Sequence, residues 1–170
     1  MIIKGPTEQM VEKGASLLYQ SCKAFIRTKG SVVLAVPGGR SVAGLFRLLV
    51  TFRLDWRKVH IFMLDERLVP EDHPESNCRL VRQWFGPLDV AGMIHPFIYD
   101  PERPEESVAG YGEELARYGA GFDIVLASSG EDGHIGSLFP NHPSVQARGS
   151  RFILVNDSPK PPSSRMSAGV

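Results

Sequence analysis

The sequence predicts a single α/β domain over residues 1–170, in which helices cover both faces of a parallel β-sheet. Two observations support this fold class. The short runs expected to form strands, such as SVVLAV at 31–36, are continuously apolar, which is typical of strands buried on both faces. Stretches with helical spacing separate most of these runs, and parallel strands need such crossover connections. No repeat, low-complexity tract or linker divides the chain.

Start and stop signals place four helices. Thr7 could cap the first helix, in which apolar residues recur at near-helical spacing until Gly30 ends it. Ser76 could cap the third helix, and the fourth has Pro104 near its start and Gly119 after its end. The expected helices cover residues 8–29, 42–52, 77–85 and 104–118.

Apolar runs rich in β-branched residues place the strands. Between them, we expect a polar loop over residues 65–75 and an irregular stretch over 86–102, with a short extended piece at 93–98. The expected strands cover residues 31–36, 59–64, 122–127 and 151–155.

Composition excludes several functional classes. Lys+Arg and Asp+Glu number 19 each, so no overall positive field attracts nucleic acid or an anionic membrane. No apolar run approaches the roughly 20 residues of a membrane span. Cys22 and Cys78 match no metal or redox spacing, and we expect free thiols in a reducing cytosol. The chain is therefore expected to be cytoplasmic, with neither nucleic acid nor membrane as partner.

Four segments with unusual chemistry follow the expected strands or lie between them. In open parallel sheets, ligands bind beyond the carboxyl ends of the strands. We therefore expect these segments to meet at one rim of the sheet. They are Gly38-Gly39-Arg40-Ser41, Asp65-Glu66-Arg67, the run from Gly130 to Pro140, and the run from Asp157 to Pro162.

His134 is the candidate with the most specific chemistry. Histidine is the side chain whose ordinary pKa lies near neutrality, so His134 could act as a general base that Asp132 orients. A structural histidine and a metal ligand are the alternatives. His142 and Glu131 lie close in sequence to this pair, but the spacing of the four residues matches no standard zinc pattern. We expect no metal.

An anion could bind at the same rim. The glycine loop at 38–41 enters a helix, so its backbone N–H groups could hold a phosphate, although a plain tight turn is equally compatible. Arg67 suits bidentate phosphate or carboxylate contact, and Lys160 and Arg165 could add cations. Internal ion pairing and an ordinary surface loop are the alternatives. Neither a P-loop nor a G-x-G-x-x-G fingerprint occurs, so no nucleotide cofactor is expected.

At these residues the chain resembles the 6-phosphogluconolactonase family, within the larger group that includes glucosamine-6-phosphate deaminases. The most specific part is the Asp-Gly-His run joined to Ser-Leu-Phe-Pro and Ser-Pro-Lys-Pro-Pro. One departure is Arg40, which stands before Ser41 where the family usually has a small hydroxyl residue. The matching segments are Gly38-Gly39, residues 65–70, residues 75–77, residues 131–134 with 137–140, and residues 158–162 with Arg165.

The resemblance implies a Rossmann-like fold and metal-independent hydrolysis of 6-phosphoglucono-δ-lactone to 6-phosphogluconate, in the oxidative pentose phosphate pathway. His134 would take the proton from the attacking water, and Asp132 would set its orientation. A δ-lactone is an activated ester, so a positioned water, a base and donors for the oxyanion suffice. The substrate-binding residues implied are Gly38, Gly39, Arg40, Ser41, Asp65, Arg67, Gly130, Gly133, Lys160 and Arg165.

Two other functions remain as alternatives. A glucosamine-6-phosphate deaminase or isomerase would use Asp65 as its proton-shuttling base. That branch usually has an aromatic residue at the position of Arg67 and continues its histidine run with Ala-Phe-Asn, unlike residues 136–139 here. The second alternative is a non-catalytic module, either a sensor domain or a truncated inactive homologue, that binds a sugar phosphate in the same pocket.

The resemblance also implies something about the end of the chain. Family members continue past the Ser-Pro-Lys-Pro-Pro loop with further strands and helices. We therefore expect no strand after Arg165 and a sheet that lacks its C-terminal part. An unpaired edge of this kind invites self-association or a partner chain. A fragment, a truncated isoform and a natural minimal form are equally open.

Overall fold

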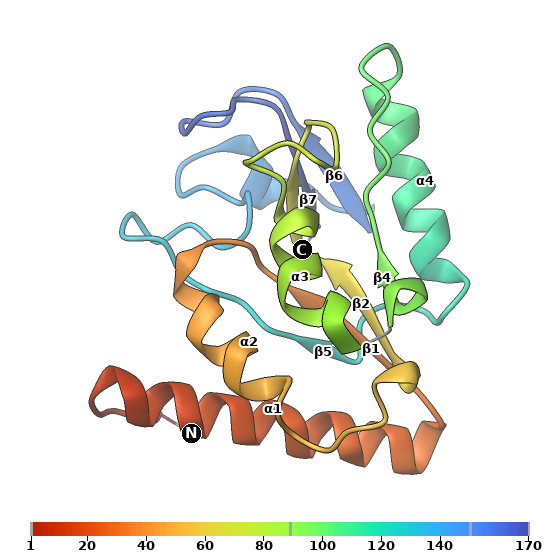
Figure 1. Cartoon of the computed structure of the whole chain (residues 1–170). Helices are drawn as coiled ribbons and strands as arrows, with labels where there is room; N and C mark the ends of the chain where they lie inside the picture. The colour runs from red at the N-terminus through yellow and green to blue at the C-terminus, as the bar shows by residue number, and fades with distance from the viewer. Residues whose placement is uncertain (1, 89, 150, 170) are drawn as a thin grey trace.

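The computed structural model describes residues 2–88, 90–149 and 151–169; of Arg40 it describes the backbone only. A four-stranded parallel sheet in the order β4-β2-β1-β5 forms the centre (Figure 1). Strands β1 and β2 pair in parallel from Val32 opposite Val59 to Val36 opposite Met63. The strands are β1 (Val32–Val36), β2 (Val59–Met63), β4 (Ile94–His95) and β5 (Ile124–Val125).

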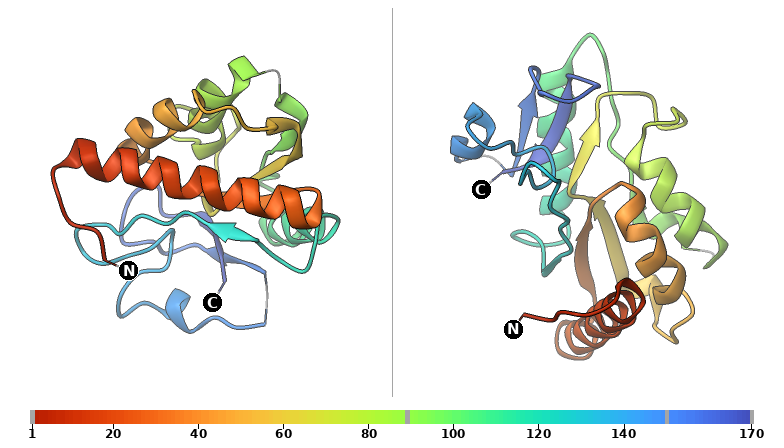
Figure 2. Two further views of the ribbon diagram at one scale, coloured as in Figure 1. Left: turned by 90° about the horizontal axis from the view of Figure 1, so that it is seen from below. Right: turned by 90° about the vertical axis from the view of Figure 1, so that its left-hand side faces the viewer.

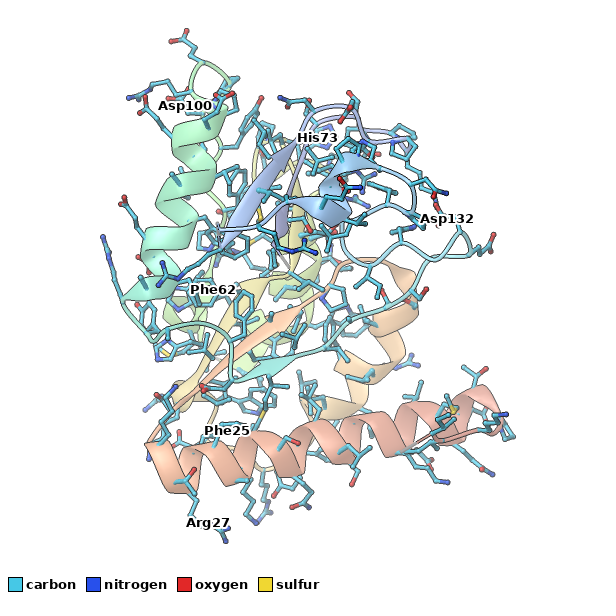
Figure 3. The ribbon with its side chains drawn as sticks, turned by 180° about the vertical axis from the view of Figure 1, so that it is seen from behind. Phe25, Arg27, Phe62, His73, Asp100 and Asp132 are labelled. Carbon is cyan, nitrogen blue, oxygen red and sulfur yellow. The ribbon has the colours of Figure 1, made fainter. Side chains whose placement is uncertain are left out.

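Four helices surround this sheet, and they cover both of its faces as the sequence predicts. Helices α2 and α3 lie on one side and α4 on the other (Figure 2). Ring contacts agree with this arrangement: Phe85 of α3 meets Phe46 of α2, and Phe62 of β2, labelled in Figure 3, meets Tyr111 of α4. The helices are α1 (Thr7–Lys29), α2 (Ala43–Leu49), α3 (Asn77–Phe85) and α4 (Pro104–Ala116).

The central strands are apolar because both of their faces are covered. All five residues of β1 are buried, which explains why this run is apolar without alternation. The expected strand at 122–127 is ladder-paired only at Ile124–Val125, and the extended piece at 93–98 pairs only at Ile94–His95. Within the described residues, no helix combines the length and apolar character that crossing a membrane requires.

A second sheet, with three antiparallel strands, corrects three sequence-based expectations. Its order is β3-β7-β6, with β3 at Asp65–Arg67, β7 at Arg165–Ala168 and β6 at Phe152–Val155. The expected polar loop at 65–75 therefore begins with a strand. The run at 151–155 joins an antiparallel sheet instead of the parallel one. The expectation of no strand after Arg165 is wrong, because β7 begins there and pairs with both neighbours.

The helix ends agree with the sequence at two places and differ at one. Gly30 takes a left-handed conformation (φ 88°) and donates its N–H to the Ile26 carbonyl, as expected of a residue that ends a helix. Ser76 caps α3, because its Oγ accepts a hydrogen bond from the Arg79 N–H. The expected Thr7 cap is wrong: Thr7 is already helical, and Pro6 precedes the helix without a capping side chain.

Candidate active site

A cavity of about 390 Å³ lies where β1, β2 and β5 end and the small sheet begins. It contains eight of the residues that the sequence predicts for the site. Asn77, Ser128, Ser129 and Gly136 also line it, although the sequence suggested no role for them. The predicted residues in its wall are Gly38, Gly39, Ser41, Asp65, Arg67, Gly130, His134 and Arg165.

The glycine loop after β1 lies directly against α3. A Cβ on Gly38 would come within 1.7 Å of the Asn77 Oδ1, so only glycine fits at this position. Gly39 has a φ of +93°, which also favours glycine. Asn77 Nδ2 donates a hydrogen bond to the Asp65 carbonyl at 2.8 Å. Asn77 thus joins the glycine loop to the start of β3.

Glu66 holds the N-terminus of α3 through hydrogen bonds. Its buried carboxylate accepts hydrogen bonds from the backbone N–H groups of Asn77 and Cys78, both at 2.7 Å, and from Ser76 Oγ at 3.1 Å. Burial raises the pKa of Glu66, and these hydrogen bonds act in the opposite direction. A carboxylate at a helix N-terminus is also favoured by the helix dipole. Glu66 therefore supports the cavity wall without lining it.

His134 and Asp132 form a pair at the mouth of the cavity. His134 Nδ1 lies 2.5 Å from Asp132 Oδ1, on the loop that follows β5 (Figure 3). A carboxylate accepts a proton donor, so Asp132 selects the tautomer with hydrogen on Nδ1 and leaves Nε2 with a free lone pair. Hydrogen bonds from His134 and then Lys160 hold the pKa of Asp132 well below its usual range.

Glycines give the loop its shape. A Cβ on Gly130 would lie 2.1 Å from His134 Cε1, so the imidazole packs onto bare backbone there. Gly133 takes a φ of +84° and donates its N–H to the Gly130 carbonyl, and the Gly130 N–H donates to the His134 carbonyl. The Phe139 ring lies 5.0 Å from the imidazole, between ring centres. Gly130 and Gly133 therefore position His134.

Asp65 lies on the cavity floor, 6% exposed. Ser137 Oγ donates a hydrogen bond to Asp65 Oδ2 at 2.9 Å. Burial raises the pKa of Asp65, whereas the Ser137 hydrogen bond and the charges of Arg67 and Arg165 act against the rise. The cavity thus contains a second carboxyl group, separate from the one that orients His134.

Arg67 and Arg165 lie directly opposite each other on the adjacent strands β3 and β7. They are direct partners in the β3–β7 pairing, where two like charges repel unless something lies between them. Burial lowers the pKa of Arg165, and the charge of Arg67 lowers it further. Arg67 donates from Nη1 to the Glu75 carbonyl, while its buried Nε has no hydrogen-bond partner within the described part of the chain. The pair thus brings two positive charges to one cavity.

Three predicted residues, Asp132, Gly133 and Lys160, lie outside the cavity wall. Lys160 Nζ is 2.9 Å from Asp132 Oδ1, so this cation contacts the histidine–aspartate pair. His142, considered above as a possible metal ligand, forms hydrogen bonds through Nε2 with Asp157 and through Nδ1 with Ser144. Across the residues that the structure describes, no group of three or more His, Cys, Asp or Glu is arranged to hold a metal. The Arg40 side chain lies outside the described part.

The fold and the cavity define an α/β protein with a histidine–aspartate pair and an arginine pair at the carboxyl ends of parallel strands. The chain belongs to the family described as glucosamine-6-phosphate isomerases/6-phosphogluconolactonase, whose model matches residues 6–170.

Individual relatives agree with this assignment. A 6-phosphogluconolactonase of Synechocystis sp. is 36% identical over 157 residues, which cover 87% of this chain and 65% of the relative. One of Mycobacterium leprae is 32% identical, covering 94% of this chain and 70% of the relative. The crystal structure of a 6-phosphogluconolactonase from Shewanella baltica superposes with a TM-score of 0.87 at 25% identity, covering 98% of this chain and 72% of that one. The chain thus spans about two thirds of the length of these relatives.

Proposed function

We propose that this chain hydrolyses 6-phosphoglucono-δ-lactone to 6-phosphogluconate. The observation that supports this most is one cavity that contains both a base oriented by a carboxylate, His134 with Asp132, and a pair of arginines that can receive a phosphate. The names of the relatives support the same reaction.

The reaction needs a base for water and a place for negative charge. His134 Nε2 takes a proton from water as the oxygen attacks the lactone carbonyl carbon. The carbonyl oxygen becomes an oxyanion, and backbone N–H groups of the glycine loop at 38–41 are the donors we assign to it. When the tetrahedral intermediate collapses, the bond to the ring oxygen breaks, and protonated His134 returns the proton to that oxygen. One water is added across one ester bond.

The arginine pair gives the substrate its orientation. Arg67 and Arg165 bring two positive charges to the cavity from adjacent strands, which favours binding of a phosphate dianion there. Holding the 6-phosphate at this point places the lactone ring between the arginines and His134. Binding of the remote phosphate therefore lowers the barrier by fixing the carbonyl near the base.

Asp65 is the feature that favours a second function. A glucosamine-6-phosphate deaminase or isomerase would need this buried carboxyl group as its proton shuttle. Arg67 and residues 136–139 depart from the pattern of that branch. We therefore place the deaminase second, and assign Asp65 to contact with substrate hydroxyl groups in the lactonase.

The proposal places the reaction in the cytoplasm. Cys22 and Cys78 are free and buried, and burial raises the pKa of each thiol to about 12. Thiols of this kind are inert and typical of a reducing compartment. We propose neither nucleic acid nor a membrane as a partner.

The test is lactone disappearance, with the lactone generated in situ by glucose-6-phosphate dehydrogenase. Buffer alone measures spontaneous hydrolysis. We expect acceleration by the chain and a loss of about 10²–10⁴-fold in His134→Ala. His60→Gln, at the opposite end of β2, is the matched control and should retain activity. A His134→Ala variant that is folded and fully active would contradict the assignment of the base.

A paired experiment separates the alternatives. Asp65→Asn and His134→Ala are assayed for lactone hydrolysis and for ammonia release from glucosamine 6-phosphate. A lactonase shows the first activity and depends most on His134, whereas a deaminase shows the second and depends most on Asp65. Binding of a sugar phosphate without either reaction would indicate a binding module.

A further inference from the structure

Lys160 lies on the histidine–aspartate pair. Its Nζ donates to Asp132 Oδ1, the oxygen that also faces His134 Nδ1, and lies 3.4 Å from that nitrogen. The Asp132 and Lys160 side chains are each 42% exposed. An ion pair at this exposure holds little by itself, because water screens the charges and two long side chains must be ordered. Something else must place Lys160 there.

The loop at residues 158–163 supplies that placement. Ser158 Oγ donates to the Lys160 carbonyl at 2.9 Å and accepts from the Lys160 N–H at 3.2 Å. The loop is closed by a hydrogen bond of 3.0 Å from the Ser158 N–H to the Ser163 carbonyl. The backbone at Lys160 is therefore held on both sides.

Arg165 braces the same loop from the cavity side. Its Nε donates to the Pro162 carbonyl at 3.0 Å, and its Nη2 donates to the carbonyls of Pro161 at 2.8 Å and Lys160 at 3.3 Å. Arg165 is buried, 5% exposed, so these bonds are protected from water. The arginine that lines the anion site thus also fixes the loop that presents Lys160.

We propose that Lys160 is a positioning residue: it holds Asp132, and through Asp132 holds the imidazole of His134 with Nε2 directed to the substrate. This inference rests on the proposed function and deepens it, because it gives Lys160 a role other than phosphate binding. The phosphate contacts are left to Arg67 and Arg165. The Arg165-braced loop then connects the phosphate site to the base.

The charges around His134 give this role a signature. Among the described residues, Asp132, Lys160 and, from β3, Asp65 interact with the imidazole, and Arg67 and Arg165 line the same cavity. Removing the lysine cation favours the protonated imidazole, because a positive charge 3.4 Å from Nδ1 no longer repels it. A phosphate ligand would instead contribute to substrate binding. The two roles therefore affect different measured quantities.

The kinetics of Lys160→Met distinguish a positioning role of Lys160 from phosphate binding. We expect kcat to fall about 10- to 100-fold with KM nearly unchanged, since a misplaced base slows the chemical step. The acid limb of the pH profile should move to higher pH, since the nearby cation is lost. Inhibition by inorganic phosphate should be as strong as in the unmodified chain, and Lys160→Arg should restore most of kcat. Lys58→Met, at a lysine that pairs with Asp55 before β2, is the matched control.

A titration of His134 by ¹⁵N NMR makes the second distinction and needs no turnover. The signal is assigned with His134→Gln, and its midpoint should move to higher pH in Lys160→Met but not in Lys58→Met, because only the first variant removes a cation beside the ring. An unchanged midpoint, or a large rise in KM with weakened phosphate inhibition, would overturn the proposal. A shifted midpoint in a chain that hydrolyses no lactone would leave Lys160 as a positioning residue and remove the lactonase function.

Discussion

Gly38 and Gly130 lie so close to side chains of the cavity that neither position has room for a Cβ. At each position, an added methyl group would overlap a side chain of the site, Asn77 in one case and His134 in the other. The sequence predicts both glycines as site residues, but as backbone that contacts substrate. The structure gives a further reason for glycine at both positions: the absence of a Cβ leaves room for the Asn77 and His134 side chains.

Gly130→Ala tests this at the level of one methyl group. Because the new Cβ would lie 2.1 Å from the imidazole, His134 must move away from Asp132. We expect activity to fall by about 10²-fold, since a misplacement of about 1 Å can have that effect. Gly92→Ala is the control, because nothing lies within 4 Å of its added Cβ. Equal kcat values for the two variants would contradict the packing argument.

Arg67→Met tests the anion site. Removing one guanidinium of the facing pair should raise KM about 10- to 100-fold, the scale of one hydrogen bond to a charged group. Inhibition by inorganic phosphate should weaken by a similar factor. Arg27→Met, on the exposed part of α1, should leave both constants in place. An Arg67→Met variant with normal KM would place the phosphate elsewhere.

At the scale of elements, the strands differ in how far the sequence predicts them. Strands β1 and β2 are continuously apolar because helices cover both faces, so their sequence alone identifies them. Strand β3 (Asp-Glu-Arg) is polar and pairs with a strand about a hundred residues later. Nothing local in its sequence predicts that partner. Polar strands of this kind become recognisable only once the fold brings their partners together.

Ser76→Ala tests the end of α3 that Glu66 and Ser76 hold together. The substitution removes the cap on the Arg79 N–H and one hydrogen bond to Glu66. We expect the free energy of unfolding, measured in urea, to fall by about 1–2 kcal/mol. Ser107→Ala is the comparison: Ser107 lies in the first turn of α4, and its Oγ also bonds backbone groups, those of Asp100 and Arg103. No loss at Ser76 would show that Glu66 alone holds the helix.

A histidine pair between β2 and β4 should make stability depend on pH. His60 Nδ1 lies 3.1 Å from His95 Nε2, and burial lowers the pKa of both residues below the usual 6.5. Their contribution to stability is therefore full above about pH 6.5 and is lost as the pH falls through the lowered pKa values. Urea unfolding at pH 7 and pH 5 should show this loss.

The control for this pH effect is His95→Phe, which keeps a ring stacked on Phe62. Its stability should fall less between the two pH values. The raised pKa values of Asp65 and Glu66 act in the opposite direction, since groups with raised pKa stabilise the folded state more at low pH. Comparing the two proteins cancels that contribution. Equal losses in both would assign the pH effect to other groups.

For the whole molecule, the sequence predicts the central sheet and the rim at which the site residues meet, because ligands in open α/β sheets bind there. It could not predict which acid Lys160 pairs with, since that depends on how Arg165 folds the loop. Asn77 and Glu66 could have been predicted as site residues, because both belong to motifs that carry the family resemblance. Their role follows only from contacts between β3, α3 and the glycine loop.

The β5 edge of the parallel sheet could pair with a strand of another chain. Among the residues that the structure describes, β5 pairs only with β1. Val125 on that strand is 50% exposed, and Ile135 nearby is 46% exposed. Such an edge can pair with another strand. The expectation that it takes up a second copy or a partner chain stays a prediction.

If one cavity both binds a phosphate and hydrolyses a lactone, a phosphorylated lactone should be hydrolysed faster than a plain one. The measurement is kcat/KM for 6-phosphoglucono-δ-lactone relative to glucono-δ-lactone, in the unmodified chain and in Arg67→Met. We expect a preference of about 100-fold or more for the phosphorylated lactone, reduced at least about tenfold by Arg67→Met. Equal rates for the two lactones, or no hydrolysis above the spontaneous rate, would contradict it.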